Sequence, residues 1–323
     1  MGAVSGQGTT YNLPNYHGEL FQVTPTETPF LSAIGGLNGA VPTKSKVFEW
    51  QTTDRRASSA GNTAVEGAPA PNGVARSRSN VTNVVEIHHS AVEVSYTRQA
   101  ATGEYAGANL GLDDNPISDE LAEQIAAELE SMAVDVELSF LSGEYANPAN
   151  NSTARKTRGI LKAITTNVNG NAGTSRPLSK DIVDATLVTM FKNGAKLPQA
   201  STVFMVGPDL KVGLSNVYSA AGLNQPTQTR TIGGVAIDTL MTDFGVFGVM
   251  LNRHMPTGQI GILDLSVCRP RFLAIPGKGL LFAEPLAKTG ASEKWQLYGE
   301  IGLEYGPENY HGLITDLAAP TAG

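Results

Sequence analysis

The chain has 323 residues, of which 41% are hydrophobic, so it can bury a core in one large multi-part domain or in two to three smaller units. Its net charge of −7 argues against a general nucleic-acid-binding protein, because neutralising phosphates takes a clustered basic face. The single Cys268 excludes an internal disulfide framework, and no run approaches the roughly 18 consecutive apolar residues of a transmembrane helix.

Charged residues make up 16% of the chain, against about 25% in a typical soluble protein. A monomer with so few charges is poorly protected against self-association, whereas a chain built to assemble needs less of that protection. The alternative, a soluble protein with a surface rich in Thr and Asn, stays open on this feature alone. Met1 to Gly18 does not resemble a signal peptide, so we expect the chain to be made and folded in a cytoplasm.

The first elements in chain order are an extended arm and two strands. Residues 1–43 mix Gly, Thr, Pro and Asn with isolated apolar anchors, and Pro25 and Pro29 argue against a helix running across 24–29. Residues 46–53 alternate like a half-buried strand, and residues 81–98 form a long run rich in Val and Ile. Between these strands, residues 55–78 hold no Leu, Ile, Met or aromatic side chain, which predicts a protruding hairpin loop.

The clearest helix is predicted over residues 116–142, with Pro116 in its first turn and Gly143 after its end. One apolar stripe follows the helical spacing, and it consists of Leu121, Ile125, Leu129, Met132, Val136 and Phe140. The other faces carry seven acids, and no Lys or Arg occurs from Gln99 to Ala154. The balancing cations must therefore come from elsewhere in the fold or from another chain.

Alternating helices and strands follow. We predict a helix over 179–194, a strand over 202–206, a short helix over 208–218 and several strands over 231–272, which together indicate an α+β or α/β module. Residues 295–305 alternate as one long amphipathic strand whose apolar face could cover the long helix.

Common catalytic signatures are absent from the sequence, so no enzyme activity, cofactor or metal site is predicted. The adjacent His88 and His89 would point to opposite faces of a strand and could not chelate one metal together. Asp113 and Asp114 could attract a divalent cation, but a solvated acidic turn is the preferred interpretation. Asn-Tyr-His-Gly occurs at 15–18 and again at 309–312, and coincidence is the default explanation.

The order of arm, strand, extended loop, strand, long helix, α/β module and closing strand resembles the α+β major capsid proteins of tailed bacteriophages of the Hong Kong 97 type. Local sequence stretches at 11–21, 28–31, 48–51, 233–238 and 251–256 are similar to an actinobacteriophage-like subgroup of that family. The similarity covers essentially the whole chain, and its weight lies in the order of the parts.

The resemblance implies a division into five parts. These are the N-terminal arm over 1–45, the extended β-hairpin loop over 46–98, the peripheral domain over 99–178 with its spine helix over 116–142, the axial domain over 179–275, and closing peripheral strands over 276–323. It also implies a shell subunit that assembles into homo-hexamers and homo-pentamers, encloses double-stranded DNA without reading its sequence, and ends in the virion capsid after assembly in the bacterial host cytoplasm.

Further partners implied by the resemblance are a portal and a decoration protein. Because the arm begins close to Met1, a separate scaffolding protein is expected rather than a cleaved N-terminal segment. Some members cross-link a loop lysine to a neighbour's asparagine. This chain has no Lys between Lys46 and Lys156, so that chemistry is not expected at the loop tip.

In this family the extended loop lies over the peripheral domain of a neighbouring subunit. Four loop arginines could then contact a neighbour's acidic helix, mostly to set orientation and register. The candidate contact residues are Arg55, Arg56, Arg76, Arg78, Asp119, Glu120, Glu123, Glu128, Glu130, Asp135 and Glu137. An encapsulin-like compartment shell, a phage tail component and an enzyme with an unfamiliar site remain alternatives.

Overall fold

A computed structural model describes residues 24–54, 58–73, 75–101, 120–220, 230–232 and 235–319. The expectations for Arg55, Arg56, Asp119, the Asp113–Asp114 turn and the first Asn-Tyr-His-Gly lie outside the described residues. The chain divides into two compact units: unit 1 comprises Met1–Thr26, Ser90–Ser131 and Ala283–Leu297, and unit 2 comprises Glu27–His89, Met132–Phe282 and Tyr298–Gly323.

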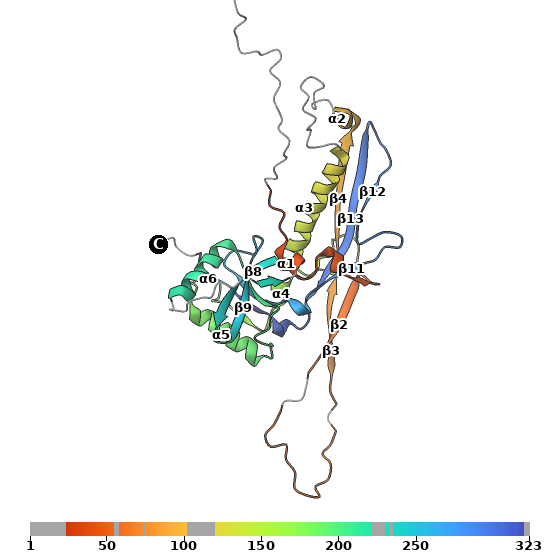
Figure 1. Cartoon of the computed structure of the whole chain (residues 1–323). Coiled ribbons are helices and arrows are strands. Elements are labelled where there is room, and N and C mark those ends of the chain that lie inside the picture. The colour runs from red at the N-terminus through yellow and green to blue at the C-terminus, as the bar shows by residue number, and fades with distance from the viewer. Residues whose placement is uncertain are drawn as a thin grey trace, which may run out of the picture. The chain divides into compact units, whose positions relative to one another are not determined.

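A seven-stranded sheet forms the centre of unit 2 (Figure 1). Its strands, in spatial order, are β5 (Val168–Asn169), β14 (Gly312–Ile314), β10 (Ile260–Asp264), β6 (Thr202–Val206), β9 (Gly245–Leu251), β8 (Val235–Thr242) and β7 (Arg230–Ile232). The strand predicted over 202–206 is confirmed as β6, whose five residues are all buried because both faces of the sheet are covered. The sheet also takes β5 and β14 from outside the segment 179–275.

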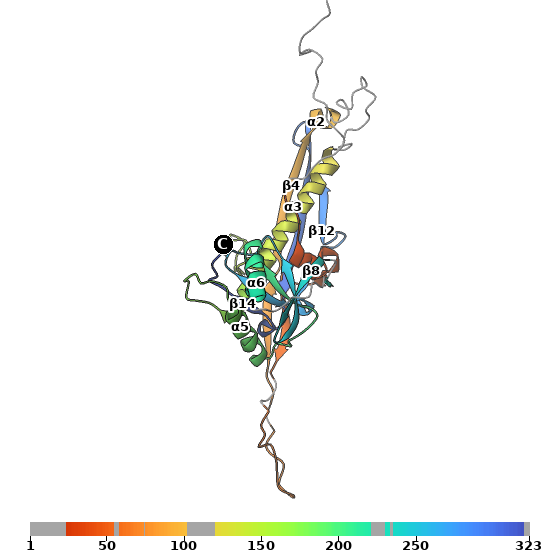
Figure 2. The ribbon, with the colours of Figure 1, turned by 60° about the vertical axis from the view of Figure 1, so that its left-hand side comes forward.

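Two helices cover one face of this sheet. They are α5 (Lys180–Lys192) and α6 (Pro208–Ala220), and both confirm predicted helices. Val183, Leu187 and Met190 of α5 and Leu210 and Leu214 of α6 are buried in one apolar cluster with the sheet residues of that face. Figure 2 shows α5 and α6 from a second direction. Gly194, at φ +93°, follows α5 in the left-handed conformation that commonly ends a helix.

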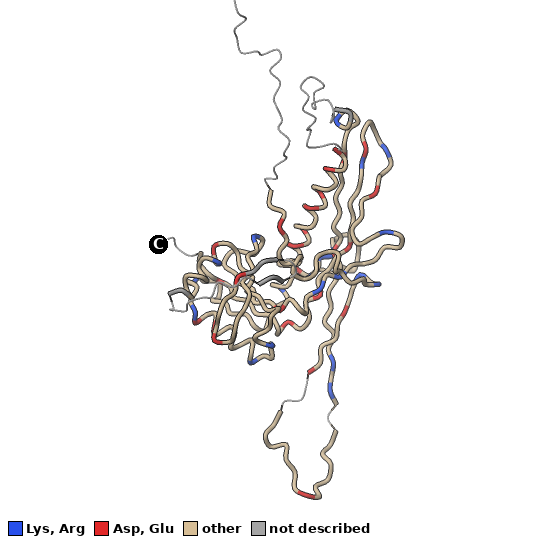
Figure 3. Tube along the Cα trace, viewed as in Figure 1, with Lys and Arg blue, Asp and Glu red and all other residues tan. Residues whose placement is uncertain are grey.

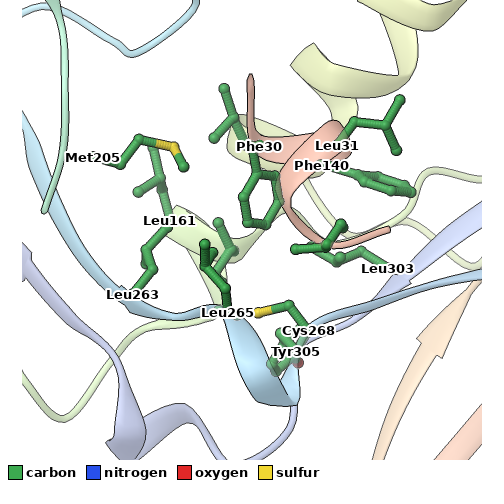
Figure 4. Packing of buried hydrophobic residues seen from close by; sticks show 14 of the residues in the cluster. Phe30, Leu31, Phe140, Leu161, Met205, Leu263, Leu265, Cys268, Leu303 and Tyr305 are labelled. Carbon is green, nitrogen blue, oxygen red and sulfur yellow. The ribbon is translucent and has the colours of Figure 1, made fainter. Parts of the chain in front are cut away.

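A second apolar cluster fills the opposite face of the sheet (Figure 4). It joins α1 (Pro29–Ala33), the C-terminal part of α3 (Glu120–Ser142) and α4 (Ile160–Ala163), and it includes the completely buried Phe30 and Phe140. The expectation of an extended arm through residue 43 is wrong here, because Pro29 occupies the first turn of α1, where a missing N–H costs nothing. This part of the arm belongs to the subunit core.

The long helix α3 confirms the predicted helix from Glu120 to its end at Ser142, where Gly143 follows. Along the predicted apolar stripe Met132, Val136 and Phe140 are buried, while Leu121, Ile125 and Leu129 are half-buried. The residues before Glu120 lie outside the described part of the chain. The helix has residues in both units, as do β4, β12 and β13.

The strands predicted on either side of residues 55–78 form a hairpin of β2 (Val47–Thr53) and β3 (Arg78–Val84), in register from Val47 opposite Val84 to Thr53 opposite Arg78. The run over 81–98 is not one strand. It breaks at Val85, continues as β4 (Glu86–Ser95) in another sheet, and ends in the helix α2 (Tyr96–Ala101).

The other sheet has the order β1 (Val41–Thr43), β11 (Arg269–Leu273), β13 (Ser292–Glu304) and β12 (Leu281–Pro285), with β4 also pairing with β13. The predicted closing strand is therefore confirmed as β13. Ile301 and Leu303 share the apolar cluster with Val136 and Phe140 of α3, as its alternation indicated. Three short 3-10 turns complete the described elements: Leu37–Gly39, Leu265–Val267 and Glu308–Tyr310.

Hydrogen bonds and close packing hold the base of the β2–β3 hairpin against β13 within unit 2. Asn83, completely buried, donates from Nδ2 to the carbonyl of Leu303 at 2.7 Å and to that of Arg158 at 3.1 Å. A Cβ on Gly302 would lie 2.7 Å from the Val84 carbonyl oxygen and 2.8 Å from the Phe48 ring, so the glycine allows close contact there. The hairpin base is part of the subunit core.

Candidate assembly surfaces

The outer part of the extended loop, of which the structure describes residues 54, 58–73 and 75–77, lies beyond the ends of β2 and β3 (Figures 1 and 2). Every described residue of this loop is exposed. Hydrogen bonds of its described backbone are local, such as Asn62 N–H to the Ser59 carbonyl at 3.2 Å and Ala68 N–H to the Val65 carbonyl at 3.1 Å. The described part of the loop therefore packs against no other residue that the structure describes.

The charges of the loop are separated along its length (Figure 3). Arg76 lies in the loop just before β3, Arg78 is the first residue of β3, and both are exposed. Neither arginine forms an ion pair with another residue that the structure describes. Glu66 lies near the middle of the loop, beside Gly67 in a turn. Two cationic side chains thus lie at the base of the loop without an ion-pair partner among the described residues, and the exposed Asp54 lies at the same end.

The acids of α3 differ from one another in their surroundings. Glu120 is only 6% exposed and pairs with Arg98 of α2 at 2.7 Å, so its partner is in its own chain. Half-buried Glu128 accepts a hydrogen bond from the Ser90 hydroxyl. Glu130 and Asp135 are exposed, and Glu123 is half-buried. The sequence left open whether the cations for these acids come from elsewhere in the fold or from another chain. For Glu120 the cation comes from α2 of the same chain, which the spacing along α3 did not indicate.

The expectation that Glu137 contacts a neighbouring subunit is wrong, because its side chain is completely buried inside unit 2. Its Oε2 accepts from the Leu31 N–H at 2.7 Å, and its Oε1 accepts from the Phe30 N–H at 3.0 Å and from Asn252 Nδ2 at 2.6 Å. Burial raises the pKa of this carboxyl, and these three donors oppose that shift. Glu137 links α3 to the first turn of α1 and to the segment after β9, so it does not face a neighbour.

The structure places His88, His89 and His311, three of the histidines that it describes. His88 is 8% exposed and His89 is exposed, which confirms that they point to opposite sides of β4. His311, from the second Asn-Tyr-His-Gly, is completely buried; the Asp264 N–H donates to its Nδ1 and its Nε2 donates to the Tyr305 carbonyl at 2.8 Å. Cys268 is buried, and burial raises the pKa of its thiol well above its usual value. Among the residues that the structure describes, no three His, Cys, Asp or Glu side chains could hold a metal ion.

Sequence reasoning missed a hollow in unit 2 near the C-terminal end of α3, lined in part by Leu138 and Lys156. The sequence offers one weak signal, because Leu138 lies off the predicted apolar stripe, and the structure shows it 41% exposed. A single exposed leucine on an acidic helix face is common and does not by itself indicate a contact surface. Such a surface needs several apolar groups from different segments, and sequence alone does not show that these segments lie together.

Solved structures share this fold along almost the whole chain. A capsid subunit of cyanophage A-1(L) has a TM-score of 0.70 at 14% identity, with 96% of this chain and 98% of that chain covered. An encapsulin, SrpI of Synechococcus elongatus PCC 7942, has a TM-score of 0.61 at 12% identity, with 97% and 94% covered. A chain from Mycobacterium phage Adephagia has a TM-score of 0.59 at 13% identity, with 98% of each chain covered.

The search of curated proteins gave no match. No helix in the described part of the chain has the length and apolar character needed to cross a membrane. A family model described as the SU10 major capsid protein matches residues 3–318. The resemblance of the sequence to phage capsid subunits of the Hong Kong 97 type is thereby confirmed, and the chain belongs to the SU10 major capsid protein family, whose members form the icosahedral shell of a phage virion.

Proposed function

We propose that this capsid subunit gathers into hexamers and pentamers that enclose double-stranded DNA, and that its extended loop lies over a neighbouring subunit. In this assignment α3 and the strands β12 and β13 belong to the peripheral domain, and α5, α6 and the strands β6 to β11 belong to the axial domain. The role is structural rather than catalytic. The observation that carries the proposal is the loop itself, because its described residues are all exposed and bond only locally.

The charges of the loop indicate which residues of a neighbouring subunit it contacts. Arg76 and Arg78 are exposed cations, and the exposed or half-buried acids of α3 that remain candidates are Glu123, Glu128, Glu130 and Asp135. A single exposed ion pair contributes only about 0–1 kcal/mol. Repetition over many equivalent contacts in a closed shell adds these small terms, so the pairs can set register even where each is weak.

Reversal of the loop charges tests this proposal. The whole chain, expressed and purified, should form closed shells visible by negative-stain electron microscopy. The double variant Arg76→Glu/Arg78→Glu should lose most shells, because it places acids opposite acids. Lys192→Glu/Lys196→Glu makes the same charge change at exposed residues elsewhere and should still assemble. Equal assembly of the two variants would contradict the docking of the loop on acidic residues.

The contents of the particles distinguish a shell that encloses DNA from an encapsulin-like compartment, which shares the fold. Particles purified from infected cells and treated with nuclease should retain protected double-stranded DNA. Particles that hold a protein cargo and no protected DNA would contradict the proposed enclosure of DNA.

A further inference from the structure

An open hollow of about 640 Å³ lies in unit 2 near the end of α3. Leu138 from α3, Leu161 from α4 and Leu313 from β14 contribute apolar surface to it. Leu138 is 41% exposed, whereas Leu161 and Leu313 are buried at 4% and 6%. The hollow therefore offers a small apolar floor that is open to solvent.

Two acids and two lysines line the hollow, and only one pair of them forms a salt bridge. Glu144 pairs with Lys162 at 3.2 Å, and Glu86 accepts a hydrogen bond from the Thr157 N–H at 3.2 Å. Lys156 also lines the hollow and is exposed, and its ammonium has no ion-pair partner among the described residues. A cation without a partner thus stands next to the apolar floor, where it could bind an acid that arrives together with an apolar group.

The tip of the extended loop carries that combination. Val65 is 80% exposed and the adjacent Glu66 is exposed as well. A turn presents them together, closed by the Ala68 N–H bond to the Val65 carbonyl at 3.1 Å, with Gly67 at φ +77° in the left-handed region. An exposed valine beside an acid complements an apolar floor beside an unpaired lysine.

We propose that the loop tip of one copy docks in this hollow of a neighbouring copy, with Val65 over Leu138 and Leu161 and Glu66 beside Lys156. This inference rests on the proposed function, in which the loop lies over a neighbour, and it adds where the tip lands. The basic residues Arg76 and Arg78 then bind acids elsewhere on that neighbour. Val65 gains burial and Glu66 gains a cation, and neither finds these within the described part of its own chain.

A disulfide between copies tests the contact in assembled shells. The variant Glu66→Cys/Lys156→Cys, mildly oxidised after assembly, should give multimer bands on a non-reducing gel that a reductant removes. Each single variant and the matched control Glu66→Cys/Lys192→Cys should stay monomeric on the gel. The native Cys268 does not compete, because it is 2% exposed. Shells that form but cross-link no more than the control would overturn the docking site and leave the proposed function standing. Failure of the unmodified chain to form any shell would instead overturn the proposed function, and this inference with it.

Charge exchange provides a second measurement if the cysteine variant does not assemble. Glu66→Lys and Lys156→Glu should each raise the subunit concentration needed for shells by about two- to five-fold, as expected for one exposed pair. The combined variant should need nearly the same subunit concentration for shells as the unmodified chain, because it restores opposite charges across the contact. Purely additive losses would overturn the pairing of Glu66 with Lys156.

Discussion

The Glu137 site and the extended loop show two opposite ways in which this chain treats charge. Glu137 is completely buried and accepts three hydrogen bonds from its own subunit. Arg76 and Arg78 are exposed and have no ion-pair partner among the described residues. The first arrangement stabilises the subunit before assembly. The second leaves the subunit unchanged and, in our proposal, acts only when a neighbour arrives.

We expect the replacement of Glu137 to lower the stability of the free subunit more than any other substitution described below. Glu137→Ala leaves the backbone N–H groups of Phe30 and Leu31 buried without acceptors and the Asn252 amide with only the Met205 sulfur, which should lower the free energy of unfolding by about 3–5 kcal/mol. Glu123→Ala, at a half-buried site on the same helix, should change it by less than about 0.5 kcal/mol. Denaturant unfolding of unassembled subunits measures both, and similar values for the two variants would refute the role of Glu137.

A smaller loss should follow from crowding the base of the hairpin. A Cβ at Gly302 would lie 2.7 Å from the Val84 carbonyl oxygen, so Gly302→Ala should cost about 1–3 kcal/mol. Gly73, in the extended loop, has nothing within 4 Å of the corresponding position, and Gly73→Ala should be nearly neutral. Thermal unfolding of the two alanine variants compares the packed base with the unpacked loop, and an equally large loss at Gly73 would mean that the loop is packed.

The buried His311 predicts a loss of stability in mild acid. Burial lowers the pKa of His311 below its usual 6.5, so the unfolded chain binds a proton that the folded subunit does not. The free energy of unfolding should therefore fall as the pH drops below about 6.5, by up to about 1.4 kcal/mol per pH unit. His311→Gln should flatten this dependence, while His89→Gln, at an exposed site, should not. A pH dependence that is unchanged in His311→Gln would argue against this assignment.

The smallest effect on the subunit itself should come from removing most of the extended loop. Replacement of residues 58–73 by a short Gly-Ser linker should alter the free energy of unfolding by less than about 1 kcal/mol, because loop-closure entropy depends weakly on length. Shell formation should nevertheless fail. Denaturant unfolding of the free subunit measures the change in stability, and light scattering at the assembly concentration measures shell formation. Normal shells from the shortened chain would show that the extended loop is not needed for assembly.

Much of the fold could be predicted because periodicity reports burial directly. The stripe ending at Val136 and Phe140 follows from helical spacing, and β6 follows from a short continuous apolar run. The alternating sequence of β13 predicted the strand correctly, although residues on both of its faces are buried near its C-terminal end. The helix α1 was missed because Pro29 was read as a helix breaker, although it is compatible with a first turn. The break at Val85 was missed because β3 and β4 have similar compositions but belong to different sheets.

Charge was harder to interpret than hydrophobicity. Glu137 has apolar residues at both neighbouring turns, namely Ala133, Val134, Phe140 and Leu141, which indicates the buried side of α3. Counting acids along the helix hid that signal. Which acid finds an internal partner depends on distant segments such as α1 and α2, and their placement depends on tertiary packing rather than on local spacing.

The most direct test of the central claim is a structure of the assembled shell at side-chain resolution. We predict that the guanidinium of Arg76 or Arg78 lies within about 4 Å of Glu123, Glu128, Glu130 or Asp135 of a neighbouring subunit. A shell in which the loop arginines, Arg55 and Arg56 included, all face solvent would contradict it.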